Sequence, residues 1–204
     1  MSEEARIDPD TQAFYQNSAR EWAAAFPYDY SRFIAGFVER LAPRALILEL
    51  GCGDGRDGAR MEALGFRVDA TDGTAAMAAL AEEKLGRPAR VMQFGELATV
   101  GEYDAVWAHA SLHHQPMAGL ADVLGRVALA LKPGGIFFAN YKLGDGQHRD
   151  ALGRLYNFPP REQLLGLYKE ISGWSFAAVE GYRGSGMDKV ERDWIAITMQ
   201  KDPA

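Results

Sequence analysis

The 204-residue sequence predicts an α/β fold: one doubly wound, mostly parallel sheet with helices on both faces. Three observations predict it. Strand-like and helix-like segments alternate from residue 45 to residue 141 with short connections, as in a series of βαβ units. The segments 45–50 and 136–141 are nearly continuous apolar runs, which is typical of strands buried on both faces. Two late strand segments, 175–180 and 194–200, follow each other without a helix and predict an antiparallel pair.

Apolar spacing predicts the elements in order. Residues 1–43 form an N-terminal helical cap, with apolar side chains at helical spacing in 11–27 and again in 30–41. Residues 44–204 form the core of the same single domain, with strands at 45–50, 66–71, 91–94, 103–108, 136–141, 175–180 and 194–200. Helices are expected at 75–85, 120–131 and 160–168, and a turn at 132–135. The polar, glycine-containing stretch 144–150 is the best candidate for a mobile loop.

Composition narrows the possible functions. Twenty-two basic against 28 acidic residues, a net charge of −6, argue against a general nucleic-acid binder. The single cysteine excludes a disulfide framework and a cysteine-based zinc site. The first ten residues lack the basic start and apolar run of a signal peptide, and no apolar stretch approaches the roughly 20 residues of a membrane span. We therefore expect a cytoplasmic protein with neither a nucleic-acid nor a membrane partner.

A glycine-rich loop, Glu49 to Arg56, directly follows the first buried strand. Glycines there let the chain turn sharply next to a ligand, and the following helix N-terminus favours negative charge. Asp72 ends the second strand, where a carboxylate can accept both hydroxyls of a bound ribose. Two interpretations compete. Counted from Gly53, the loop matches the G-x-G-x-x-G pattern of nicotinamide dinucleotide sites; counted from Gly51, it reads G-x-G-x-G. Because Gly51 already ends the strand, the second register is favoured.

Counted from Gly51, the loop resembles the first motif of the class I S-adenosylmethionine-dependent methyltransferases, of the small stand-alone bacterial type. The resemblance continues through YDAVW at 103–107, SLHH at 111–114 and LKPGG at 131–135, and covers residues 44–142. It implies a Rossmann-like, seven-stranded sheet with an antiparallel last strand, and S-adenosyl-L-methionine as cofactor. It also implies methyl transfer to an O, N or S nucleophile of a small molecule. The alternative from another functional class is a module that binds this cofactor or S-adenosylhomocysteine without transferring a methyl group.

The resemblance also implies the site residues. Asp72 would hold the ribose, Gly73 and Met77 would flank the adenine, and Tyr15 and Arg20 are candidates for the methionine carboxylate. Similar enzymes often place an aspartate after the third strand for the adenine amino group. This chain has none there, so Glu96 or the backbone of Glu96 and Leu97 would substitute. The remaining expected cofactor contacts lie in the glycine loop and at the end of the fourth strand: Glu49, Gly51, Cys52, Gly53, Gly55 and Ala108.

No residue is assigned firmly to catalysis, because an activated methyl group can be transferred by proximity and alignment alone. The resemblance makes His109 and His113, which follow the fourth strand, candidates for bordering the reacting methyl, and it makes Tyr141 a candidate in the acceptor pocket. No metal is expected, because no nearby cysteine or carboxylate completes a coordination sphere around the histidines. The segment after the fourth strand does not match the motif of DNA amino-methyltransferases, so we expect a small-molecule acceptor. Residues 11–28 are interpreted as a lid that orders when the cofactor binds.

Overall fold

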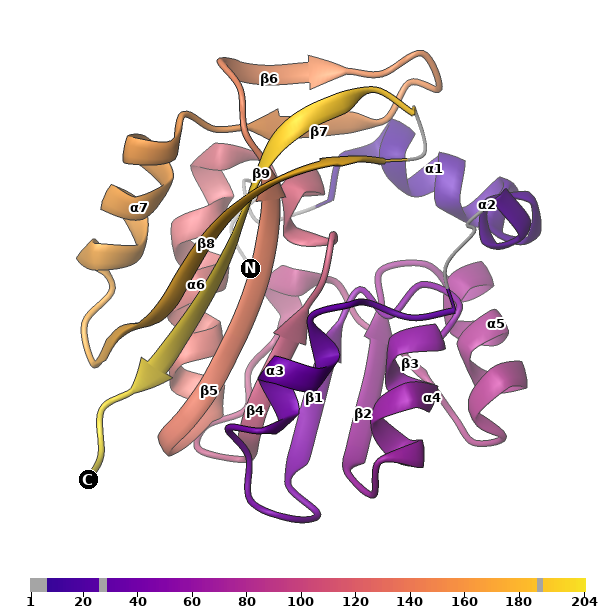
Figure 1. Ribbon diagram of the computed structural model, residues 1–204. Coiled ribbons are helices and arrows are strands. Elements are labelled where there is room, and N and C mark those ends of the chain that lie inside the picture. Colours follow the sequence, from indigo (N-terminus) through magenta and orange to yellow (C-terminus); the bar gives the residue numbers. More distant parts are fainter. Residues whose placement is uncertain (1–6, 26–28, 187–188) are drawn as a thin grey trace.

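The computed structural model describes residues 7–25, 29–186 and 189–204, and its centre is a seven-stranded sheet of order β3-β2-β1-β4-β5-β9-β8 (Figure 1). The five strands from β3 to β5 are parallel, and β9 runs antiparallel to both of its neighbours. The predicted fold class is confirmed. The strands are β1 (Leu46–Leu50), β2 (Arg67–Asp72), β3 (Arg90–Val91), β4 (Tyr103–Ala108), β5 (Leu131–Lys142), β8 (Trp174–Ser185) and β9 (Glu191–Lys201).

Helices cover both faces of this sheet. On one face lie α3 (Ile34–Val38), α4 (Arg56–Ala63) and α5 (Ala75–Leu85); on the other lie α6 (Met117–Ala130) and α7 (Arg161–Glu170) (Figure 1). Because side chains alternate along a strand, neighbouring residues enter different cores. Trp107 of β4 packs in the core under α3 and α4, whereas Val106 and Ala108 pack in the core under α6. The parity of a residue, meaning its even or odd position along the strand, therefore decides which face of the sheet its side chain reaches.

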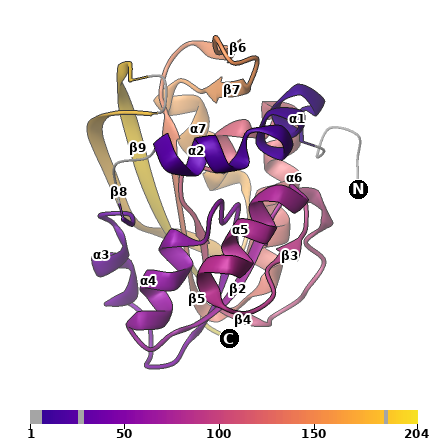
Figure 2. The ribbon, with the colours of Figure 1, turned by 90° about the vertical axis from the view of Figure 1, so that its right-hand side faces the viewer.

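Three further segments lie beyond the carboxyl ends of the parallel strands. These are α1 (Pro9–Asn17), α2 (Ala19–Ala25) and a hairpin of β6 (Gly146–Arg149) and β7 (Leu155–Phe158) (Figures 1 and 2). The expectation of a loop at 144–150 was wrong, because residues 146–149 pair with residues 155–158 in an antiparallel sheet. Residues 26–28 of the predicted lid lie outside the described residues.

Several predicted boundaries differ from the structure. The strand predicted at 91–94 is only Arg90–Val91, followed by a single 3-10 turn, η2 (Phe94–Glu96). The helix predicted at 30–41 is limited to α3. The turn at 132–135 lies inside β5 as an irregularity: Tyr103 pairs with Leu131 and Ala105 with Ile136, so the chain inserts extra residues opposite β4. Gly134 takes a φ of +76° there, a conformation that favours glycine.

Candidate functional site

The glycine loop turns against the segment that follows β4. Gly51 and Gly53 have φ values of +76° and +55°, and a Cβ on Gly51 would lie 2.5 Å from the Cβ of Ser111. The amides of Gly51 and Cys52 donate to the carbonyl of Thr71 at 2.9 and 2.8 Å. These amides are therefore used to hold the loop on β2, and the loop offers mainly its glycine surfaces to a ligand.

Asp72 ends β2 beside this loop. Its carboxylate accepts hydrogen bonds from the Gly53 amide at 3.1 Å and from the amide and hydroxyl of Thr74 at 3.0 and 3.1 Å. Burial raises the pKa of Asp72 to about 6 although these donors act in the opposite direction. A buried carboxylate of this kind favours a ligand that brings further hydroxyl donors.

Glu49 ends β1 below the loop and is buried. Burial, reinforced by the negative charge of Asp57, raises the pKa of this carboxyl well above its ordinary value. Gly58 packs against it, since a Cβ on Gly58 would lie 2.6 Å from the Glu49 Oε2. Packing therefore explains why residue 58 is a glycine. The G-x-G-x-x-G pattern, which ends at this residue, is then no evidence for a bound dinucleotide.

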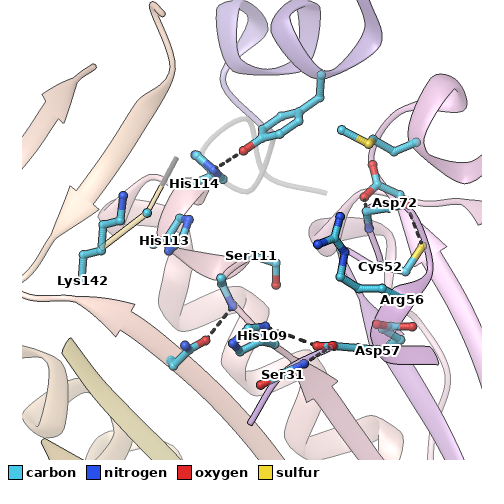
Figure 3. A pocket seen from close by; sticks show the side chains of 18 of the residues that line it. Ser31, Cys52, Arg56, Asp57, Asp72, His109, Ser111, His113, His114 and Lys142 are labelled. Atoms are coloured by element: carbon cyan, nitrogen blue, oxygen red, sulfur yellow. Dashed lines mark hydrogen bonds and ion pairs between the residues drawn. The ribbon is translucent and has the colours of Figure 1, made fainter. Parts of the chain in front are cut away.

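A cavity of about 470 Å³ opens at the carboxyl ends of the strands and has two sides (Figure 3). We call the first the glycine-loop side; it contains Cys52, Gly53, Asp72, Gly73 and Met77. We call the opposite wall the aromatic side; it contains His113, Lys142, Tyr156, Tyr182 and Trp194. His109 and Ser111 lie between the two sides (Figure 3). One cavity can therefore hold two molecules, or two parts of one molecule, next to each other.

A chain of buried and partly buried hydrogen bonds borders the aromatic side. Asp150 pairs with Arg154 at 2.6 Å, Arg154 donates to the Tyr15 hydroxyl at 3.0 Å, and Tyr15 contacts His114 at 2.8 Å. The Nδ1 of His114 faces the carbonyl of Leu155 at 2.7 Å and must donate to it, so Nε2 accepts from Tyr15. Burial lowers the pKa of His114 to about 3, which fits this neutral tautomer. The chain joins α1, η3 (Leu112–His114) and β7.

The structure places ten of the sequence-predicted site residues on the cavity wall. The hydroxyl of Tyr15 is already engaged by Arg154 and His114, so its predicted contact with a carboxylate would compete with these bonds. Six other residues do not line the cavity: Arg20, Gly55, Glu96, Leu97, Ala108 and Tyr141. The ten that do are Tyr15, Glu49, Gly51, Cys52, Gly53, Asp72, Gly73, Met77, His109 and His113.

Local packing explains three of the residues that lie elsewhere. Arg20 pairs with Glu83 at 2.7 Å on the exposed surface. Gly55 serves the contact between α4 and α5, because a Cβ there would lie 2.9 Å from the Cα of Ala81. Glu96 turns back to accept from the Gln93 amide at 2.7 Å. These three side chains are used by the fold itself.

The other three enter the core under α6 and α7. Ala108, Leu97 and Tyr141 are buried there, and the Tyr141 hydroxyl lies 2.8 Å from that of Tyr168. The neighbours of Tyr141 on the strand, Asn140 and Lys142, have the opposite parity and line the cavity. Strand alternation was the signal that could have identified Asn140 from the sequence and excluded Tyr141.

Sequence reasoning also missed cavity residues on other elements. Gln93 and Phe94 line the cavity where Glu96 and Leu97 were expected, because η2 turns the chain after β3. Asp57 could have been suspected from its place in the first turn after the glycine loop. No local pattern marked the remaining cavity residues that come from distant segments, which include Arg32, Arg154, Tyr182 and Trp194.

Comparison with known proteins finds methyltransferases among the proteins similar to this chain. Residues 48–137 match the family model of a methyltransferase domain. The chain is 29% identical over 179 residues to an uncharacterised methyltransferase of Synechocystis, covering 76% of this chain and 78% of that relative. These matches support the resemblance to the class I S-adenosylmethionine-dependent methyltransferases that the glycine loop predicts. S-adenosylmethionine is the cofactor that goes with this methyltransferase family.

Solved structures share the fold of this methyltransferase. One is the 1,6-didemethyltoxoflavin N1-methyltransferase of Burkholderia thailandensis, with bound 1,6-didemethyltoxoflavin and S-adenosylhomocysteine (TM-score 0.71, 24% identity, 93% of this chain and 84% of that chain). Another is a [4+2]-cyclase (TM-score 0.77, 16% identity, 98% of each chain). The same fold therefore carries more than one kind of reaction.

No helix in the described ranges is long and apolar enough to cross a membrane. Within those ranges, no group of three or more His, Cys, Asp or Glu side chains is arranged to hold a metal ion.

Proposed function

We propose that this methyltransferase transfers the methyl group of S-adenosylmethionine to an O, N or S atom of a small molecule. The observation that carries the proposal is the single cavity, in which the glycine-loop side and the aromatic side face each other across His109 and Ser111. A donor on the first side and an acceptor on the second would meet without crossing solvent, as a water-excluded transfer requires.

The glycine-loop side and the cavity residues next to it, Arg56, Gln93 and Phe94, fit the cofactor. Asp72 would accept the ribose hydroxyls, since its carboxylate is buried at the end of β2 and lines the cavity. Met77 and Phe94 would contact the adenine, with Gln93 at its edge in place of Glu96 and Leu97. We propose Arg56, which lines the cavity beside the loop, in place of Arg20 near the methionine carboxylate. The bound cofactor supplies a methyl group already activated by the positive sulfur, so the protein mainly aligns and desolvates.

The aromatic side supports a planar acceptor. Tyr182 and Trp194 stack with ring centroids 5.8 Å apart and planes 22° apart, and Tyr156 lies on the same wall. Flat aromatic faces bind planar ligands by stacking and by burying apolar surface. Planar heteroaromatic compounds are therefore the first acceptors to test.

We further propose that α1 and α2 cover the cavity together with the β6–β7 hairpin. Arg149 of β6 pairs with Asp8 through two bonds of 2.9 and 2.7 Å, and the Leu155 amide donates to the Thr11 hydroxyl at 2.7 Å. A lid joined in this way would move as one body. Hydrogen exchange should therefore slow in both segments, residues 9–25 and 146–158, when S-adenosylhomocysteine binds. Equal exchange with and without that ligand would show a permanently docked cover.

Thermal shift and calorimetry test the cofactor, and a metabolite screen tests the reaction. S-adenosylmethionine and S-adenosylhomocysteine should raise the melting temperature through linkage, whereas NAD should not. A shift with NAD and none with either sulfur ligand would overturn the proposal. Release of S-adenosylhomocysteine only in the presence of an acceptor would establish transfer. Tight binding without release across the library would support the alternative of a binding module.

A further inference from the structure

A histidine and a buried carboxylate lie in contact at the boundary between the two sides of the cavity. His109 follows β4, and its Nδ1 lies 3.3 Å from the Oδ2 of Asp57, in the first turn of α4 (Figure 3). The side chain of Asp57 is 7% exposed, whereas that of His109 is 30% exposed and lines the cavity. The pair therefore has a buried acidic end and an accessible imidazole end.

Asp57 is held as a carboxylate by more than this contact. It accepts from the Ser31 amide at 2.7 Å and from the indole nitrogen of Trp107 at 3.0 Å. Burial by itself would raise the pKa of Asp57, but the contact with His109 and these donors outweigh it and hold the pKa below its ordinary value. The imidazole is fixed as well, because it stacks on the Trp107 ring with planes 25° apart.

The contact sets which nitrogen of His109 carries a proton. An ionised carboxylate only accepts hydrogen bonds, so the Nδ1 that faces Asp57 is the protonated nitrogen of the neutral ring. Nε2 then carries the lone pair. Apart from this contact with Asp57, His109 makes no hydrogen bond to any residue within 7–25, 29–186 or 189–204. Its Nε2 is thus available to accept a proton from a molecule in the cavity.

Two other histidines are less suited to accept a proton in this cavity, and a third lies outside it. Both ring nitrogens of His114 are engaged, by Leu155 and Tyr15. His113 has a buried Nδ1 without a partner among the described residues, and burial lowers the pKa of its ring well below the ordinary value. His148 pairs with Asp145 at 3.0 Å outside this cavity. It offers a matched His–Asp control.

We propose that His109 is the general base of the transfer and that Asp57 positions it, for acceptors whose attacking atom arrives with a proton, such as a hydroxyl or an N–H group. This inference rests on the proposed function. The acceptor's proton passes to Nε2, and the electron pair left behind forms the new bond to the methyl carbon. The sulfur–methyl bond breaks with its electron pair staying on sulfur. The resulting imidazolium faces Asp57 and later releases its proton to water.

The free protein provides the first test. With four histidines in the chain, single His→Gln variants assign each ring in nitrogen-detected NMR. The expected spectrum of neutral His109 has a protonated Nδ1 and a bare Nε2, and this preference weakens in Asp57→Asn. His148→Gln identifies the signal of the other His–Asp pair. A protonated Nε2 on neutral His109 of the wild type would overturn the proposal, because that nitrogen could not take a proton.

Kinetics with the acceptor that the metabolite screen returns provides the second test. His109→Gln should lower kcat by roughly 10²–10⁴-fold, the usual contribution of a general base, and should remove the loss of rate at acid pH. The other charged and titratable side chains to consider on this part of the cavity wall are Asp57 on α4, Arg32 before α3, His113 on η3 and Tyr182 on β8. None of these is altered in the variant.

Matched variants separate the possible failures. Calorimetry should show S-adenosylhomocysteine binding within twofold of wild type in His109→Gln, and His148→Gln should keep both rate and pH profile. An unchanged kcat and profile in His109→Gln would overturn the proposal, as would an acid limb that is lost in His113→Gln instead. Failure of the proposed function has a different signature: the wild type itself would not bind S-adenosylhomocysteine or would release none.

Discussion

The two sides of the cavity are built in different ways. Every residue that defines the glycine-loop side comes from one stretch, 52–77, which runs from the end of β1 through β2 into α5. The aromatic side instead collects one residue each from η3, β5, β7, β8 and β9, spread over residues 113–194. One side is local in sequence, and the other exists only once distant segments have packed together.

This difference has a functional consequence. A local motif keeps its geometry wherever the strand–loop–helix unit forms, so the same cofactor side can recur across a family. A wall made of single residues from five elements can be changed one residue at a time, which suits a fold that carries many reactions. The shared fold of a methyltransferase and a [4+2]-cyclase among the similar structures agrees with this division.

The largest expected effect is on the aromatic side. Arg154 is 1% exposed and joins Asp150 on one side to Tyr15 on the other. Arg154→Met should lower the free energy of unfolding by about 3–5 kcal/mol, because it leaves a carboxylate without its partner and cuts the link to α1. Denaturant titration measures this. Arg149→Met removes an exposed arginine that also pairs with an aspartate, Asp8, and should cost much less. Equal losses would contradict the larger contribution expected from the buried arginine.

The glycine-loop side should be sensitive to one methyl group. Gly51→Ala should cost about 2–5 kcal/mol, because the left-handed backbone disfavours alanine and the new Cβ would overlap Ser111. Gly65 also has a positive φ, but a Cβ there would meet nothing within 4 Å. Gly65→Ala should therefore cost only the backbone term of about 1–2 kcal/mol. The two melting curves, compared at equal conditions, isolate the contribution of the close contact.

Asp72 should affect binding more than stability. Asp72→Ala should weaken S-adenosylhomocysteine binding by about 1–3 kcal/mol, since hydrogen bonds to a charged acceptor are lost. Asp69 lies on the same strand but pairs with Arg90 and Tyr103 and does not line the cavity. In Asp69→Ala the calorimetric affinity should equal that of the wild type. An unchanged affinity in a folded Asp72→Ala protein would remove this residue from the site.

The smallest effect is a dependence of binding on pH. The pKa of Asp72 is about 6 in the free protein, and ribose hydroxyls would stabilise its charged form. Affinity for S-adenosylhomocysteine should thus be constant above about pH 7 and should fall below pH 6, approaching tenfold per pH unit.

The free energy of unfolding of the free protein changes with pH in the opposite direction to the affinity. Because folding raises this pKa above 3.8, the penalty of the buried charge is present above pH 6 and fades as the pH falls toward 4. Asp72→Ala should remove the pH dependence of binding.

The sequence predicted those features that depend on neighbouring residues. Strand β4 and helix α5 have the predicted boundaries, since apolar alternation and an Ala-rich helix closed by Gly86 are local signals. Glu49, Gly51 and Asp72 line one cavity, because they belong to one strand–loop–strand unit, and their contacts with the cofactor stay a prediction. The seven-stranded sheet with its antiparallel strand followed from the order of the segments and the family resemblance.

Other predictions failed where a side chain had a choice of partners. Arg20 was expected at the cofactor but pairs with Glu83, because α2 packs along α5. Tyr141 was chosen although strand parity sends it to the opposite core, where it meets Tyr168. The stretch 146–149 reads as a polar loop because its strand is short and exposed and is completed only by β7.

By itself, therefore, the sequence determined the sheet, the glycine loop and the carboxylate at the end of β2, since backbone conformation and burial there depend on residues close along the chain. Only the tertiary structure decided which side chains line the cavity opposite these features. The contact between Asp57 and His109 spans 52 positions of sequence, and the one between Tyr15 and His114 spans 99. Such pairs form because the crossovers of a parallel sheet bring successive strand ends to one edge, and no local pattern encodes which side chains meet there.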